Sequence, residues 1–278
     1  MNHSHRHPER HPERRGQHQG QHQGQHQGQL QRPSTLLLDG SATPISPGTT
    51  LLQVARAAGV TIPTLCFLDG LSPVAACRLC LVEVAHPQGP GDPQLGPATL
   101  VPACITPAEA GMVVHTATPR LQDNRRTVIE LLFAEGNHIC AICMANGHCE
   151  LQNLAVVVGM DHNRLPYQFP SRTVDASHPR FGLDHNRCIL CTRCVRVCDE
   201  VEGAHVWDVG WRGEHCQIIA GLAEPWGAVD ACTHCGKCVE VCPTGALFHK
   251  GDSSEEKRSQ PERMQALVRA RSHHQWNP

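Results

Sequence analysis

The chain has 278 residues, enough for two ordinary domains or several small ones, with 4% aromatic residues and 24 Lys and Arg against 26 Asp and Glu. The scarcity of large aromatic side chains favours small metal-stapled modules over one large core, and the near-neutral charge gives no electrostatic case for nucleic acid as a partner. No apolar run approaches the roughly 20 residues of a transmembrane segment, and the N-terminus lacks a signal-peptide core, so we expect a cytoplasmic protein, or one peripheral to a membrane through its partners.

Residues 1–33 are polar and repetitive, with His18, His22 and His26 spaced four residues apart. A segment of this composition cannot build a core, so we predict a disordered His/Gln-rich arm. The pattern is typical of a solvated tail, whose histidines would bind nickel or zinc only weakly.

Residues 34–117 are expected to form a β-grasp domain. Asp39-Gly40 is typical of a two-residue hairpin turn, so strands are predicted on both sides of it. A helix should follow and end at Gly59. Its apolar face is predicted to contain Leu51, Leu52, Ala55 and Ala58.

Four cysteines of this domain are predicted to hold a [2Fe-2S] cluster: Cys66, Cys77, Cys80 and Cys104. Plant-type ferredoxins use C-x4-C-x2-C and a distant fourth cysteine. The order of ligands here agrees with that pattern, although the first loop is longer. A strand over LVEVA and an exposed Pro/Gly-rich loop from His86 to Pro97 are expected between Cys80 and Cys104.

Residues 118–160 are predicted to be a small helical cluster segment. Pro and Gly are typical of the first and last positions of a helix, which predicts a helix from Pro119 to Gly136. The positions expected on its inner face are Leu121, Arg125, Val128, Leu131 and Leu132.

A histidine and three cysteines follow this helix: His138, Cys140, Cys143 and Cys149. Three thiolates leave a [4Fe-4S] cluster one ligand short, and His138 is the predicted fourth because it lies at the helix end beside Cys140. The alternatives are an ordinary surface histidine, with water or another residue as fourth ligand, or a zinc site. His148 is expected to point away. An imidazole ligand would make this cluster less negative and raise its potential.

Residues 161–177 are expected to be a connector, and residues 178–251 a ferredoxin domain with two [4Fe-4S] clusters. The pattern C-x2-C-x2-C-x3-C occurs twice, and in bacterial ferredoxins the fourth cysteine of each run binds the other cluster. One ligand set is therefore predicted to be Cys188, Cys191, Cys194 and Cys242. The other is predicted to be Cys198, Cys232, Cys235 and Cys238.

Cys216 remains unassigned among the 16 cysteines. It lies in VWDVGWRGEHCQII, a predicted hairpin, and is interpreted as a packing residue of a strand. The other cysteines and His138 supply four ligands to each of four clusters. Zinc sites commonly use separated cysteine pairs, which the triple-spaced runs do not match. The predicted fold is α+β and modular, followed by a polar tail at residues 252–278.

Four stretches of the chain resemble a known family: IPTLCFLDGLSPVAACRLCLVEV, LLFAEGNHICAICMANGHCELQ, FGLDHNRCILCTRCVRVCDEVEGAHVWDV and PWGAVDACTHCGKCVEVCPTGALF. They are similar to the N-terminal part of the large iron-sulfur subunit of NADH:quinone oxidoreductase and to the accessory arm of iron-only hydrogenases. They most resemble the diaphorase iron-sulfur subunit of bidirectional NAD-linked nickel-iron hydrogenases. The respiratory family has its histidine four residues before the first cysteine, where this chain has Gly136.

The resemblance implies an electron-transfer subunit of an oxidoreductase complex, with no complete active site of its own. Its implied partners are a flavin-containing NADH dehydrogenase subunit and nickel-iron hydrogenase subunits. No G-x-G-x-x-G or G-K-[ST] motif occurs, so flavin and NAD are expected on a partner. The alternatives are a respiratory-type NADH dehydrogenase subunit, disfavoured because that family's long C-terminal region is missing, an NAD-linked formate dehydrogenase subunit, and a non-redox zinc scaffold.

Overall fold

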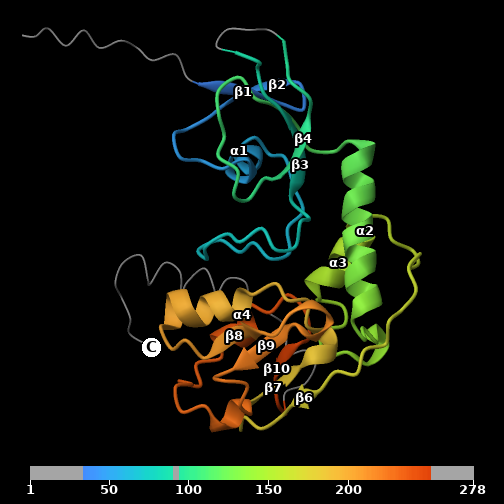
Figure 1. Ribbon diagram of the computed structural model, residues 1–278, viewed down its shortest axis with the longest axis vertical. Helices are drawn as coiled ribbons and strands as arrows, with labels where there is room; N and C mark the ends of the chain where they lie inside the picture. The colour runs from blue at the N-terminus through green and yellow to red at the C-terminus, as the bar shows by residue number, and fades with distance from the viewer. Residues whose placement is uncertain (1–33, 90–93, 252–278) are drawn as a thin grey trace, which may run out of the picture. The chain divides into compact units, whose positions relative to one another are not determined.

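The structure is a computed structural model that describes residues 34–89 and 94–251 (Figure 1). The predicted arm at residues 1–33 and the predicted tail at residues 252–278 lie outside the described residues. Three separate hydrophobic cores occur in the described part of the chain, as expected for a modular α+β protein. No helix among the described residues has both the length and the apolar character to cross a bilayer.

The first module is a five-stranded mixed sheet with strand order β2-β1-β5-β3-β4 and one helix, α1. The central pair β1 and β5 is parallel, and the other neighbours are antiparallel, which is the β-grasp arrangement. Its elements are β1 (Thr35–Leu38), β2 (Ser41–Pro44), α1 (Leu51–Ala57), β3 (Leu81–Ala85), β4 (Thr99–Pro102) and β5 (Val113–His115).

The predicted hairpin is confirmed, with β1 and β2 joined at Asp39 and Gly40, whose φ angles are 48° and 84°. Two positive φ values define the turn type that matches the twist of paired strands. Helix α1 begins with a capping box in which Thr50 and Gln53 bind each other's backbone N–H groups. The predicted inner face of α1 was wrong at Ala58, which is exposed and follows the helix, whereas Val54 is buried.

The second module contains α2 (Pro119–Glu135), a short 3-10 helix η1 (Cys140–Ile142) and α3 (Glu150–Val157), and Figure 1 shows α3 beside α2. Thr118 caps α2, Pro119 starts it and Gly136 ends it, as predicted. Leu131 was predicted on the inner face but is 51% exposed, and Ile129 is buried instead.

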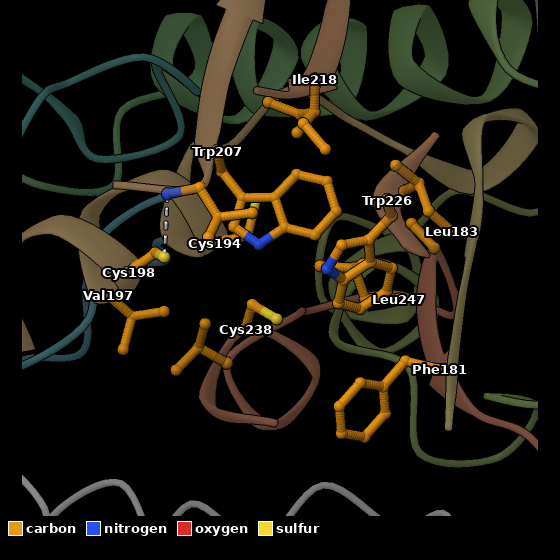
Figure 2. Close-up of a cluster of buried hydrophobic side chains, with 14 of the residues drawn as sticks. Phe181, Leu183, Cys194, Val197, Cys198, Trp207, Ile218, Trp226, Cys238 and Leu247 are labelled. Atoms are coloured by element: carbon orange, nitrogen blue, oxygen red, sulfur yellow. Dashed lines mark hydrogen bonds between the residues drawn. The ribbon is translucent and has the colours of Figure 1, made fainter. Parts of the chain in front are cut away.

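The third module combines a three-stranded antiparallel sheet, β10-β7-β6, with the predicted hairpin, which is confirmed as β8 and β9. Its core contains Trp207, Trp226 and Phe181, and the labelled cysteines lie among these rings (Figure 2). Its strands are β6 (Val174–Asp175), β7 (Phe181–Asp184), β8 (Trp207–Gly210), β9 (Gln217–Ala220) and β10 (Leu247–His249). Its helices are α4 (Arg193–Arg196), α5 (Lys237–Glu240), the π-helix η3 (Val197–Glu202), and the 3-10 helices η2 (His185–Arg187), η4 (Gly213–His215) and η5 (Trp226–Ala228).

Candidate metal centres

The four cysteines predicted for the [2Fe-2S] cluster lie together as two pairs. The Sγ atoms of Cys80 and Cys104 are 3.3 Å apart. In the other pair, the backbone N–H of Cys66 donates to Cys77 Sγ at 3.4 Å, and the N–H of Cys77 donates to Cys66 Sγ at 3.5 Å. Reciprocal N–H bonds of this kind hold two sulfur atoms on the same side of a loop.

The thiols of this group perturb one another. The hydrogen bond from Cys77 lowers the pKa of Cys66 to about 5, and the same contact raises the pKa of Cys77. The second pair behaves in the same way: the hydrogen bond between Cys80 and Cys104 raises the pKa of Cys80 and lowers the pKa of Cys104. The two sulfur atoms of each pair thus perturb each other's ionisation, and a bound metal cation would stabilise both as thiolates.

The loop around these cysteines directs backbone N–H groups at their sulfur atoms. Amides of Ala75 and Ala76 bond to Cys104 and Cys66 and lower the pKa of those thiols. Ala75 has a positive φ of 53°, a sparsely populated conformation for a residue with a side chain. The loop conformation therefore directs several N–H dipoles at the sulfur atoms, which suits an anionic cluster.

Two arginines of α4 bind this loop to the third module. Arg196 donates to the carbonyls of Cys66, Ser72 and Cys191, at 2.7, 2.8 and 3.1 Å. Arg193 donates to the carbonyl of Phe67 at 3.0 Å and pairs with Glu150, the first residue of α3. Neither arginine was predicted to have a role, because nothing local in the sequence distinguishes them from surface arginines.

The residues predicted for the His-capped cluster line one small cavity: His138, Cys140, Cys143 and Cys149. The Nε2 atom of His138 is buried and has no hydrogen-bond partner. Burial, helped by the nearby charge of Arg187, lowers the pKa of His138 to about 4. The ring is therefore neutral at physiological pH, as a metal ligand must be. His148 lines a different cavity.

The first of the paired cysteine sets also shares a cavity: Cys188, Cys191, Cys194 and Cys242. Cys242, from the second run, thus joins three cysteines of the first run, as the ferredoxin pattern predicted. The other cavity walls are mostly apolar and include Leu183, Ile189, Ile218 and Leu247. Burial raises the pKa of Cys188 to about 12, so these thiols would resist ionisation unless a metal cation stabilised the thiolate.

The second set groups Cys198 with Cys232, Cys235 and Cys238. Burial raises the pKa of Cys198 and Cys238, and the proximity of the other members of the set adds to both shifts. Cys235 is exposed, so this group lies at the edge of the module. Cys216 belongs to neither set; it lies half-buried directly before β9 and lines a cavity with Cys188.

Sequence reasoning missed a second donor group around Cys232. Ligand atoms of Cys232, His178 and His234 lie within 4.8 Å of one another. His178 is fully buried, and its Nε2 lies 2.6 Å from His234 Nδ1 and 3.9 Å from Cys232 Sγ. His178 lies 54 residues from Cys232, so no motif spacing could have revealed it.

Three family models match the chain in succession. A 2Fe-2S iron-sulfur cluster binding domain matches residues 31–119, and the NADH-ubiquinone oxidoreductase-G iron-sulfur binding region matches residues 125–164. The ferredoxin-like domain of NADH-quinone oxidoreductase subunit 3 matches residues 179–248. This combination of fold and cysteine groups defines an iron-sulfur electron-transfer subunit with one [2Fe-2S] domain and [4Fe-4S] binding domains.

Similarity to subunits of two NAD-reducing hydrogenases defines the family of the chain more closely. It is 33% identical to the gamma subunit of NAD-reducing hydrogenase HoxS from Cupriavidus necator, over 77% of this chain and 86% of that subunit. The chain therefore belongs to the family of iron-sulfur subunits that contains this gamma subunit. A solved chain of NAD+-reducing [NiFe]-hydrogenase is 36% identical, with a TM-score of 0.70, over 79% of this chain and 88% of that chain.

The respiratory relatives are similar over the same region. The mitochondrial NADH-ubiquinone oxidoreductase 78 kDa subunit of Candida albicans is 34% identical over 77% of this chain but only 28% of that protein. Several curated relatives match in this way, and the chain spans about a quarter to a third of their length. The resemblance inferred from the sequence is thus confirmed for both branches of the family.

Proposed function

We propose that the chain holds one [2Fe-2S] and three [4Fe-4S] clusters and relays single electrons between an NADH-oxidising flavin subunit and a nickel-iron hydrogenase. The ligand sets are Cys66, Cys77, Cys80 and Cys104; His138, Cys140, Cys143 and Cys149; Cys188, Cys191, Cys194 and Cys242; and Cys198, Cys232, Cys235 and Cys238. The observation that supports the sets most strongly is the grouping of each predicted set in the fold, with Cys242 and Cys198 exchanged between runs.

The residues of the chain fit this cofactor set chemically. Iron-sulfur clusters accept and return one electron at a time, which a hydride carrier such as NADH cannot do without a flavin. The chain supplies buried sulfur ligands, backbone N–H groups that stabilise their negative charge, and one neutral imidazole. Apolar walls around Cys191 and Cys194 exclude water from the ligands.

The partners and location follow from the relatives. Similarity to two NAD-reducing hydrogenases supports a cytoplasmic complex with a flavin-bearing NADH dehydrogenase subunit and nickel-iron hydrogenase subunits. By analogy with the respiratory subunit, the [2Fe-2S] and His-capped clusters would lie toward the flavin partner, and the paired clusters toward the hydrogenase. Flavin and NAD would bind to the partner.

Metal analysis and spectroscopy of the anaerobically isolated protein test this proposal. We expect about fourteen iron atoms and a similar amount of acid-labile sulfide per chain, and EPR signals of both cluster types after reduction with dithionite. Stoichiometric zinc without sulfide would contradict the proposal and support the scaffold alternative. Cys66→Ser should remove the [2Fe-2S] signal and impair hydrogen-linked NAD reduction by the assembled complex.

A second candidate is a subunit of a respiratory-type NADH dehydrogenase, which the similarity to the mitochondrial 78 kDa subunit favours. Co-purification with nickel distinguishes the candidates, because only the hydrogenase complex contains a nickel-iron centre. A nickel-free complex that reduces a quinone with NADH would identify the respiratory alternative. A formate-dependent activity without nickel would identify a formate dehydrogenase.

A further inference from the structure

One member of the second paired ligand set, Cys198, Cys232, Cys235 and Cys238, accepts a hydrogen bond from an indole. Trp226 donates from Nε1 to Cys232 Sγ at 3.4 Å. Trp207 packs edge to face against Trp226, with ring centroids 4.7 Å apart, and Figure 2 shows both rings in the core with Cys238. The indole N–H of Trp226 thus reaches a sulfur ligand of this set.

The buried His178 packs against Trp226 on the same side. Its Nδ1 accepts hydrogen bonds from the backbone N–H groups of Arg180 and Phe181, both at 3.1 Å. In a neutral ring the proton must then be on Nε2, which donates it to His234 Nδ1 at 2.6 Å, while Cys232 Sγ lies 3.9 Å away. The ring packs against both Phe181 and Trp226, with centroids 4.7 and 4.6 Å away, which fixes its orientation.

The first paired set has different surroundings. The hydroxyl of Thr244 lies 3.7 Å from Cys242 Sγ, but it donates its one hydrogen to the carbonyl of Arg187 at 2.8 Å. The positive charges of Arg193 and Arg196 act on Cys191 instead. Among the described residues, the hydrogen bond from a tryptophan N–H to a ligand sulfur is therefore found at the second set and not at the first. The sequence repeat does not extend to these contacts.

We propose that Trp226 raises the reduction potential of the cluster held by Cys198, Cys232, Cys235 and Cys238 through its indole hydrogen bond to the sulfur of Cys232. The inference rests on the ligand sets of the proposed function. Reduction adds a negative charge that is shared by the sulfur ligands, so an N–H donor stabilises the reduced state more than the oxidised state. Trp226 is a positioning residue, since it acts through Cys232.

A redox titration followed by EPR on the full-length chain, in the complex in which it is isolated, tests this effect. Trp226→Phe keeps an aromatic ring but removes the N–H. We expect the ratio of reduced to oxidised cluster at a fixed potential to fall about tenfold for this cluster alone. That ratio corresponds to a reduction potential lower by ~59 mV for a one-electron couple. The matched control is Trp211→Phe, at a ring that is 59% exposed, and it should shift none of the clusters.

A benzothienylalanine residue in place of Trp226 separates the hydrogen bond from packing, because sulfur replaces the N–H in a ring of nearly the same shape. The same shift should appear in this variant, even where the smaller phenylalanine disturbs the core. An unchanged potential, or an equal shift of all clusters, would overturn the inference. Cys232→Ser is the separate test of the ligand set: if every [4Fe-4S] signal persists unaltered, the proposed function itself is wrong at this site.

Discussion

The guanidinium of Arg196 donates a hydrogen bond to the carbonyl of Cys66 at 2.7 Å, although 130 residues separate them in the sequence. The same nitrogen atom donates to the carbonyl of Cys191 at 3.1 Å. Cys66 and Cys191 belong to the ligand sets of two different clusters. One buried nitrogen thus connects the loops that hold the proposed [2Fe-2S] cluster and the first paired cluster.

Replacing Arg196 should loosen both loops. Arg196→Gln removes a buried, charged donor from three carbonyls. A single hydrogen bond to a charged group contributes about 1.5–3 kcal/mol, so we expect the free energy of unfolding to fall by at least ~2 kcal/mol. The magnetic interaction between the reduced clusters should also weaken in EPR spectra, because their loops are no longer connected. Iron content measured in parallel shows whether the clusters are retained.

Arg56→Gln is the matched control, since Arg56 pairs with Asp69 of the same cysteine loop but is exposed. Exposed ion pairs contribute less than about 1 kcal/mol, so this variant should stay close to the wild type in both measurements. Equal effects of the two substitutions would show that Arg196 has no special role.

Two alanine variants test whether His138 is a cluster ligand or an ordinary surface histidine. His138→Ala should remove about four iron atoms per chain, whereas His148→Ala, in the same segment, should remove none. His138→Cys should retain the iron but lower the potential of this cluster, because thiolate replaces a neutral ligand. Full iron content with an unchanged EPR signal in the alanine variant would contradict ligation by His138.

The cysteine groups could be predicted because their ligands lie mostly within short loops, where spacing in sequence limits spacing in space. The exchange of Cys198 and Cys242 followed from the repeated pattern. Arg196, Trp226 and His178 could not be found in this way, because each contacts its partners through the tertiary fold. Residue type alone does not identify such contacts.

The errors in the predicted helices have a similar cause. Leu131 and Ala58 fit the apolar period of their helices but face solvent in the structure. The period of a sequence defines a stripe about 100° wide, and packing selects which part of the stripe is buried. In α2, the buried side of the helix is fixed by contacts such as the hydrogen bonds from Arg125 to the carbonyls of Leu79 and Leu81. No local sequence pattern indicates these contacts.

A buried carboxylate in α2 predicts a defined pH dependence of stability. Glu130 is 1% exposed and pairs with Arg164 and Arg126, and the hydrogen bond from Arg164 lowers its pKa below the ordinary 4.5. A lowered folded-state pKa contributes stability that is fully present above the ordinary value and is lost as the pH falls through the folded value. Glu130→Gln should therefore cost about 2 kcal/mol at pH 7, a figure reduced because Arg164 is partly exposed.

Thermal unfolding of wild type and Glu130→Gln at neutral and acidic pH measures this difference. The gap between their midpoints should narrow below pH 4.5, the ordinary value of the carboxyl group. Glu135→Gln is the control, because Glu135 is exposed near the end of the same helix and should have little effect at either pH. A gap that is independent of pH would show that packing, and not charge, makes Glu130 important.

Because Gly136 has no side chain, the ring of His138 can occupy the space beside it. A Cβ atom at position 136 would lie 2.4 Å from His138 Nε2, closer than any real contact, so Gly136→Ala must displace the imidazole. The φ of Gly136 is −105°, which alanine adopts without strain. The added Cβ would also lie 3.1 Å from the backbone carbonyl oxygen of Asn186, so a small shift is expected there, and the main effect falls on the histidine. We expect loss of the His-capped cluster, with the other clusters and helix α2 unchanged.

Iron analysis and EPR measure that loss, and a double variant identifies its cause. Cysteine is smaller than histidine, so Gly136→Ala combined with His138→Cys should relieve the steric conflict and restore the iron that the single alanine variant lacks. Gly96→Ala is a control outside this segment, where the added Cβ would meet its nearest neighbour at an ordinary 3.6 Å. If the double variant remains as iron-poor as Gly136→Ala, the glycine must be needed for the backbone path after α2 and not for the space beside His138.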